Sequence, residues 1–167
     1  TSRGETFAFS QWGCGTFEGI PTHISAHMVV SPEGLLNEAK SLRYEFGIYN
    51  PFDYLTVDES ALCATPYDGI ASRIKELALG KTPRGTVGSG VGQAYRRFRA
   101  NPLTAIKVRD LKRPELRELL AYNREQVQTE LRYIIEDEFR SEDRATLADE
   151  VRLRYSDDFR DFVVSRC

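Results

Sequence analysis

The apolar residues of this chain recur at helical spacing in two stretches of its first half. After Ser31-Pro32, an N-cap followed by proline at the first helical position, they return every three or four positions until Gly47, which suits a helix end (Leu35, Leu36, Ala39, Leu42 and Phe46). A second helix is predicted to begin at Thr65-Pro66-Tyr67-Asp68, which has capping-box spacing with Asp in place of Glu or Gln. Its buried stripe comprises Ile70, Ile74 and Leu77, and Gly80 ends it.

Short runs of β-branched and aromatic residues predict strands around these helices. Thr6–Phe9, Pro21–Val30 and Tyr54–Val57 are the three candidates, and Ile106–Val108 fits either a strand or an extended connection. The order strand, helix, strand, helix predicts an α/β layer.

The second half of the chain has a mainly helical pattern. Gln93–Ala100 predicts a short basic helix that stops before Asn101-Pro102. From Pro114 one long amphipathic helix is expected, and Ser141 and Ser156 are N-cap candidates for two more. The apolar face of the long helix comprises Leu116, Leu119, Leu120, Val127, Leu131, Ile134 and Ile135. We therefore predict an α/β portion over residues 1–112 and a helical subdomain over residues 113–167.

Composition narrows the classes of protein. With 167 residues, 41% hydrophobic and 29% charged, the chain is expected to form a globular core, and its net charge of −2 does not favour nucleic acid or a membrane as partner. Its apolar runs fall short of the ~20 residues that span a bilayer. Cys14, Cys63 and Cys167 lack Cys-x-x-Cys spacing, which favours reduced thiols in a cytoplasmic protein. Met28 is the only methionine, so we expect a fragment of a longer protein.

Two histidines are the first candidates for metal ligands. His23 and His27 lie four residues apart on the predicted strand Pro21–Val30. That spacing separates them by two full pleats, so a metal pair is not expected. We predict no metal site in this sequence.

A glycine-rich stretch carries the main candidate chemistry. Four glycines, Gly85, Gly88, Gly90 and Gly92, fall within eight positions, and three arginines follow (Arg96, Arg97 and Arg99). Glycines let bare backbone N–H groups approach an anion, a helix N-terminus adds its positive end, and arginines match phosphate oxygens. The stretch lacks the Gly-Lys-Ser/Thr ending of a Walker loop. By itself the pattern fits both a phosphate cradle and a flexible connection with solvated arginines.

Three segments resemble one enzyme family. Gly85–Tyr95 (Gly-Thr-Val-Gly-Ser-Gly-Val-Gly-Gln-Ala-Tyr) is similar to the Gly-Thr-Thr-Gly-Arg-Gly-Ile-Gly-Pro-Ala-Tyr segment of adenylosuccinate synthetases. Lys107–Leu111 is similar to the family's Arg-Val-Gly-Asp-Leu, and Val29–Glu38 to its Val-Val-Asp-Pro-x-x-Leu-x-x-Glu. Three matches in the right order are far more specific than one loop. The resemblance covers Phe7 to about Val127.

This resemblance implies a P-loop-like nucleotide-binding enzyme core and a homodimer. The family joins inosine monophosphate (IMP) to aspartate at the expense of GTP, with Mg²⁺, in purine biosynthesis. The base oxygen is first phosphorylated, and the aspartate amine then displaces the phosphate. The family's catalytic aspartate and histidine lie in a glycine-rich loop and a Gly-His-Thr motif, and neither motif occurs in this sequence. We therefore expect no catalytic residue here and no ligase activity, nor GTP or Mg²⁺ binding, from these residues alone.

The residues carried over by the resemblance belong to the nucleotide phosphate pocket: Gly85, Thr86, Val87, Gly88 and Ser89. Val87 stands where the family has a second threonine, so only its backbone N–H is expected to help, and Ser89 replaces an arginine. The family also extends an arginine to the phosphate bound by the other subunit, and Arg97 and Arg99 are equal candidates for this role.

These departures leave open a different purine monophosphate as substrate. The competing interpretation is a non-catalytic anion-binding or protein-interaction module, in which the helices of residues 113–167 dock a partner.

Overall fold

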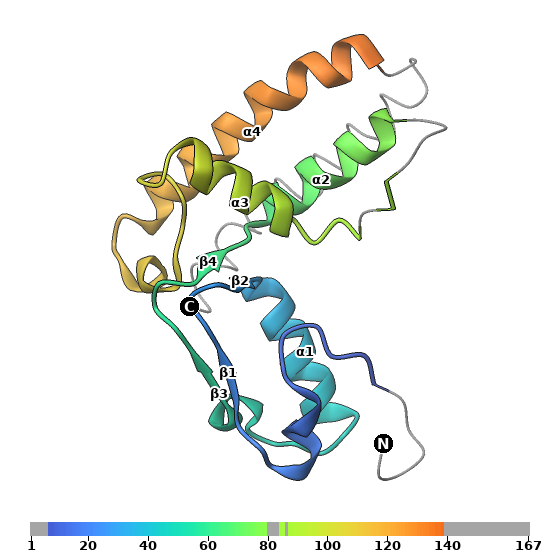
Figure 1. The fold of residues 1–167 in the computed structure, drawn as a ribbon, viewed down its shortest axis with the longest axis vertical. Helices are drawn as coiled ribbons and strands as arrows, with labels where there is room; N and C mark the ends of the chain where they lie inside the picture. Colours follow the sequence, from blue (N-terminus) through green and yellow to red (C-terminus); the bar gives the residue numbers. More distant parts are fainter. Residues whose placement is uncertain (1–6, 80–83, 86, 139–167) are drawn as a thin grey trace.

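Two lobes meet at a pair of short strands in the computed structural model, which describes residues 7–79, 84–85 and 87–138 (Figure 1). The N-terminal lobe contains η1 (Cys14–Glu18), β1 (Thr22–Ile24), α1 (Pro32–Tyr44), η2 (Pro51–Tyr54) and β3 (Leu55–Val57). The helical lobe contains α2 (Pro66–Ala78), α3 (Val91–Ala100) and α4 (Leu116–Glu138). Between the lobes lie β2 (Val29–Val30) and β4 (Leu62–Cys63), and η3 (Val108–Lys112) leads into α4.

The strands form two parallel pairs that share one register. β1 pairs with β3 and β2 pairs with β4, and Thr22 faces Leu55 with the same sequence offset by which Val29 faces Leu62. The two pairs are separate two-stranded sheets with the same sequence offset, divided by the turns Ser25–Met28 and Asp58–Ala61. Each turn is closed by a backbone hydrogen bond of 3.0 Å, from Met28 N to Ser25 O and from Ala61 N to Asp58 O.

Mixed helices and short parallel strands confirm the α/β class, but two strand predictions were wrong in detail. Pro21–Val30 is not one strand, because the turn at Ser25–Met28 divides it into β1 and β2. Phe7–Phe9 is not a strand: its rings pack edge to face with Phe17 and Phe46 at centroid distances of 5.0–6.0 Å.

The other extended segments agree better with the predictions made from the sequence. β3 confirms the strand predicted at Tyr54–Val57, although Tyr54 itself closes η2. Ile106 and Lys107 form an extended connection beside β4, where Cys63 N donates to Ile106 O, and Val108, the first residue of η3, donates through its N–H to Ala61 O. β4 was not predicted, because two residues are too few for a periodic pattern.

The four described α-helices confirm the predicted ones. In α1 the Ser31 hydroxyl accepts a hydrogen bond of 3.0 Å from Gly34 N, and Gly47 adopts a φ of +72° shortly after the helix ends. In α2 the Asp68 carboxylate accepts from Thr65 N at 2.8 Å, as the capping-box spacing predicts. α3 begins at Val91, two residues before the predicted start, and ends before Asn101 as expected.

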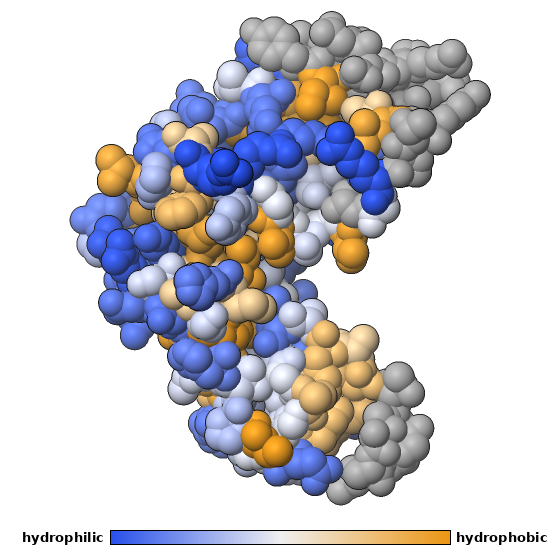
Figure 2. All heavy atoms as spheres, viewed as in Figure 1, coloured by the Kyte–Doolittle hydropathy of each residue, from blue (hydrophilic) through white to orange (hydrophobic). Residues whose placement is uncertain are grey.

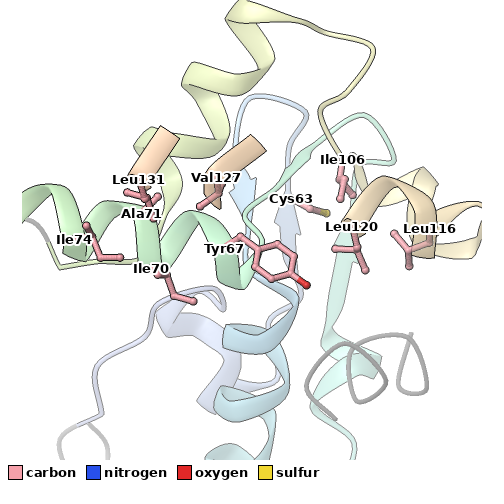
Figure 3. Close-up of a cluster of buried hydrophobic side chains, with 10 residues drawn as sticks. All are labelled: Cys63, Tyr67, Ile70, Ala71, Ile74, Ile106, Leu116, Leu120, Val127 and Leu131. Atoms are coloured by element: carbon pink, nitrogen blue, oxygen red, sulfur yellow. The ribbon is translucent and has the colours of Figure 1, made fainter. Parts of the chain in front are cut away.

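Each lobe has its own apolar core. The core of the N-terminal lobe is built around Trp12, Ile24, Val30, Leu35, Ala39, Leu42 and Ala61. The core of the helical lobe gathers side chains from α2, α4, β4 and the 106–108 segment (Figure 3). It contains Cys63, Tyr67, Ile70, Ala71, Ile74, Ile106, Leu116, Leu120, Val127 and Leu131.

Several predictions lie outside the described residues: the helix end at Gly80, the helices starting at Ser141 and Ser156, and Cys167. The division of the chain after residue 112 stays a prediction. Within the described ranges no helix is long and apolar enough to cross a membrane.

Candidate functional site

The glycine-rich loop lies along one face of α2 and then enters α3. Gly85 N donates to the Glu76 carboxylate. Further along, Gly88 lies against Arg73 and its carbonyl oxygen against Gly69, while Gly90 lies against the backbone of Asp68 and Gly69. Gly69, Arg73 and Glu76 are spaced four and three residues apart, so they share one face of the helix. This face of α2 is the bed on which the loop rests.

Two glycines of the loop cannot be replaced without a change in the loop or its bed. Gly90 has a φ of +80°, and a Cβ there would lie 2.6 Å from Gly69 N and 2.7 Å from Asp68 Cβ. Gly88 has a φ of +73°, and a Cβ there would lie 2.7 Å from Arg73 Cγ. The positive φ values and the close approach both require glycine. At Gly92, in contrast, a Cβ would meet nothing within 4 Å.

The glycine-rich loop leads directly into the N-terminus of α3, which lies at the surface and has no side-chain cap. Gly90 is the N-cap of α3, and neither a side-chain cap nor an acidic residue accompanies its first turn. Val87 and Ser89 are exposed just before it. In the space-filling view the molecule is indented between the lobes, on the side where the loop lies in Figure 1 (Figure 2). Free backbone N–H groups at a helix N-terminus attract anions.

A buried ion pair lies directly beneath the loop. The carboxylate of Asp68, which is fully buried in the first turn of α2, pairs through Oδ1 with the guanidinium of Arg97. Its Oδ2 accepts hydrogen bonds of 2.8 Å from both Thr65 N and Thr65 Oγ1. Both oxygens of the buried carboxylate are therefore engaged.

Arg97 also connects α3 to α4. Its guanidinium donates to Oδ1 of Asn123, which is itself fully buried. The Asn123 amide donates to Leu119 O at 2.7 Å and to Thr104 O at 3.2 Å. Burial lowers the pKa of Arg97 to about 10, and the negative charge of Glu130 acts in the opposite direction. The guanidinium thus stays charged at neutral pH.

The three arginines of α3 have different surroundings. The side chain of Arg97 is only 14% exposed, whereas Arg96 and Arg99 lie at the surface. Arg96 donates to Gln93 Oε1 at 3.3 Å. Arg97 thus differs sharply from its exposed neighbours.

A cavity of about 260 Å³ opens beside the ion pair, between α3 and α4. Its lining includes the buried pair Asp68 and Arg97 and the exposed residues Tyr122 and Glu130. Glu130 also pairs with Lys75 of α2.

The structure brings together most, but not all, of the site residues predicted from sequence. Gly85, Val87, Gly88 and Ser89 form the loop, and Thr86 lies outside the described residues. Arg97 and Arg99 are both on α3, but only Arg99 is exposed.

Sequence reasoning did not identify the pairing of Asp68 with Arg97, nor the role of Asn123. Asn123 did leave a signal: it is a polar residue at an apolar-stripe position, between Leu120 and Val127.

Other candidate groups do not form a second centre in the described part of the chain. No three His, Cys, Asp or Glu side chains gather there closely enough to hold a metal ion. His23 is a strand residue whose Nδ1 lies 2.9 Å from Thr56 Oγ1, while His27 lies in the turn after β1. Cys14 is exposed and Cys63 is buried. We therefore assign no described residue to Mg²⁺.

Comparisons with known proteins point to one family. The family model for adenylosuccinate synthetase matches residues 1–165. The chain is 36% identical over 116 residues to the adenylosuccinate synthetase of Neisseria gonorrhoeae, a match that covers 66% of this chain and 26% of that protein. It is 33% identical over 111 residues to the enzyme of Nitrosomonas europaea, covering 64% of this chain and 25% of that protein. The chain thus spans about a quarter of the length of these relatives. The extent of the family match shows that the chain belongs to the adenylosuccinate synthetase family.

Proposed function

We propose that the protein is a purine-nucleotide–aspartate ligase and that this chain forms part of the wall of its nucleotide phosphate pocket. The reaction is the GTP- and Mg²⁺-dependent joining of IMP, or a related purine monophosphate, to aspartate. Family membership supports the reaction class. The proposal includes a cytoplasmic location and a homodimer.

The observation that carries the proposed site is the loop itself. Gly88 and Gly90, both at positive φ, hold the backbone on α2 and lead it into the uncapped N-terminus of α3. A monophosphate placed there would accept hydrogen bonds from backbone N–H groups of Val87–Ser89 and from the first turn of α3. The exposed Val87 side chain does not enter this contact, so the backbone carries it.

Of the two candidate arginines, we assign the contact with the partner subunit's nucleotide to Arg99. Its side chain is exposed on α3, whereas the guanidinium of Arg97 is engaged by Asp68 and Asn123. A charge-assisted contact of this kind contributes roughly 1.5–3 kcal/mol. Arg99→Ala should therefore weaken IMP binding by about one to two powers of ten.

Titration calorimetry of the full-length protein with IMP tests the site, using glycine variants as a matched series. Gly90→Ala combines an unfavourable φ with a close contact, Gly85→Ala has only the unfavourable φ, and Gly92→Ala has neither. We expect Gly90→Ala to weaken binding by at least about tenfold, Gly85→Ala less, and Gly92→Ala least, since a non-glycine residue at positive φ costs roughly 1–2 kcal/mol before any clash.

Arg96→Ala serves as the control for Arg99→Ala in the same titration. Mixed dimers that combine Arg99→Ala with a loop variant then test whether the site is shared between subunits. If the wild-type protein binds neither IMP nor adenosine or guanosine monophosphate, the ligase proposal fails. A non-catalytic interaction module would then be the better interpretation.

A further inference from the structure

Three helices of the helical lobe meet at one buried polar cluster beneath the glycine-rich loop. We name Asp68 of α2, Arg97 of α3 and Asn123 of α4 the buried clamp. Asp68 and Asn123 have no exposed surface, and the Arg97 side chain is 14% exposed. The clamp joins segments that are 26 and more residues apart in sequence. It therefore fixes the position of α3 relative to both of its helical neighbours.

The clamp and the loop share Asp68. A Cβ at Gly90 would lie 2.7 Å from Asp68 Cβ and 2.8 Å from its carbonyl carbon, so the loop backbone rests on the residue that Arg97 holds. Side chains of a helix lean toward its N-terminus, and Arg97 reaches from the last turn of α3 to this bed. A displacement of Asp68 would move the support of Gly90.

The charge of Asp68 requires Arg97. A buried carboxylate is stable only when its charge is compensated and its oxygens accept hydrogen bonds. Thr65 donates two hydrogen bonds to Oδ2, both from neutral groups, and Arg97 supplies the positive charge at Oδ1. Removal of the guanidinium alone would leave an uncompensated charge at the bed of the loop.

We propose that Arg97 is a positioning residue for the glycine-rich loop, and that it supports phosphate binding through Asp68 without contacting the phosphate. The proposal rests on the proposed function for its effect on nucleotide binding. The geometry of the loop in the absence of nucleotide tests it separately.

A double-mutant cycle in the full-length protein separates positioning from direct contact. The variants are Arg97→Gln, Asp68→Asn and the double substitution, with Arg96→Gln as the neighbouring surface control. Hydrogen exchange of the 87–92 peptide, without nucleotide, reports on the loop, and the 35–44 peptide of α1 reports on the rest of the fold. Calorimetric affinities for IMP and for inosine, which lacks the phosphate, report on the phosphate contact.

We expect Arg97→Gln to accelerate hydrogen exchange of the 87–92 peptide by at least about tenfold and to weaken IMP binding by about tenfold. Hydrogen exchange in α1 and the affinity for inosine should stay unchanged. The double variant should recover most of both losses, because it removes the uncompensated charge together with its partner. Arg96→Gln should resemble the wild-type protein in every measurement.

A direct phosphate contact would give a different result and overturn the proposal. Arg97→Gln would then weaken IMP binding without a change in hydrogen exchange of the 87–92 peptide, and the double variant would not regain the lost affinity. Unchanged exchange and affinity in Arg97→Gln would overturn it as well. If Arg97→Gln does not fold, Arg97→Lys keeps the charge and should give intermediate values, and wild-type values in Arg97→Lys would contradict the role of the guanidinium. If the wild-type protein binds no nucleotide, the proposed function fails, while the exchange measurements still decide whether Arg97 positions the loop.

Discussion

The two lobes each bury a carboxylate, and they satisfy its charge in different ways. In the N-terminal lobe Glu38 of α1 accepts hydrogen bonds from the backbone N–H groups of Ser10, Gln11 and Trp12, the shortest of these being 2.8 Å, and one of 2.5 Å from the Ser10 hydroxyl. In the helical lobe Asp68 is paired with the side chain of Arg97. Backbone N–H donors remain after any substitution except one by proline, whereas the Arg97 guanidinium is lost in most substitutions. The hydrogen bonds to Glu38 anchor the segment of residues 10–12 on α1. The ion pair between Asp68 and Arg97 couples α2 to α3, and a substitution in either helix can break it.

This difference predicts the largest loss of stability for Glu38→Ala. The substitution would leave several N–H groups of residues 10–12 without their acceptor, and each unsatisfied buried group costs about 1–3 kcal/mol. Because Ser10 lies at the surface and can bind water, we expect a total loss of about 3 kcal/mol in the free energy of unfolding. Urea unfolding measures it, with the exposed neighbour Asn37→Ala as control. A loss no larger than that of Asn37→Ala would mean that these hydrogen bonds do not anchor the segment.

A smaller effect is expected for Asn123→Leu in the helical lobe. Leucine extends the apolar stripe of α4 but removes the acceptor of Arg97 and the donor to Leu119 O and Thr104 O. Gain in apolar burial offsets part of the lost hydrogen bonding, so we expect a net loss of about 1–2 kcal/mol. Thermal unfolding measures this loss, with Gln126→Leu, at an exposed position of the same helix, as the control. Increased stability would show that packing outweighs hydrogen bonding at this position.

The smallest effect of the three concerns the helix cap of the N-terminal lobe. Ser31 caps α1 by accepting a single hydrogen bond from Gly34 N, whereas Thr65 and Asp68 cap α2 reciprocally. We expect Ser31→Ala to cost about 1 kcal/mol and Ser31→Asp to cost less, since Asp is a good N-cap residue. Equal urea midpoints for wild type and Ser31→Ala would contradict the role of this cap.

Periodicity and capping residues predicted the helices well, because both are local properties of the sequence. Ser31 and the Thr65–Asp68 capping box marked two helix starts that the structure confirms. The segment at Phe7–Phe9 could not be predicted in this way. Its rings find partners in Phe17 and Phe46, and Glu38 binds the backbone that follows it. Such contacts depend on tertiary structure.

The glycine-rich loop of the candidate site could be predicted from the sequence, but the buried ion pair beneath it could not. Glycine spacing identified the loop, but the ion pair between Asp68 and Arg97 joins residues far apart in sequence, and nothing local indicates it. Two buried polar residues share a feature that can be recognised in the sequence. Glu38 and Asn123 both occupy positions within apolar helical stripes. A polar residue at such a position predicts a buried partner.

The shared register of the two strand pairs constrains how this part of the chain can change in length during evolution. One residue inserted into Ser25–Met28 alone, where the turn does not accommodate it, would shift Val29 and Val30 by one position against β4. Because side chains alternate between the faces of a strand, Val30, now 1% exposed, would turn away from the core. An insertion in Asp58–Ala61 would cause the opposite shift, and one residue added to each turn would preserve the alignment of both pairs. Insertions and deletions in these two turns are therefore expected to occur together among homologues.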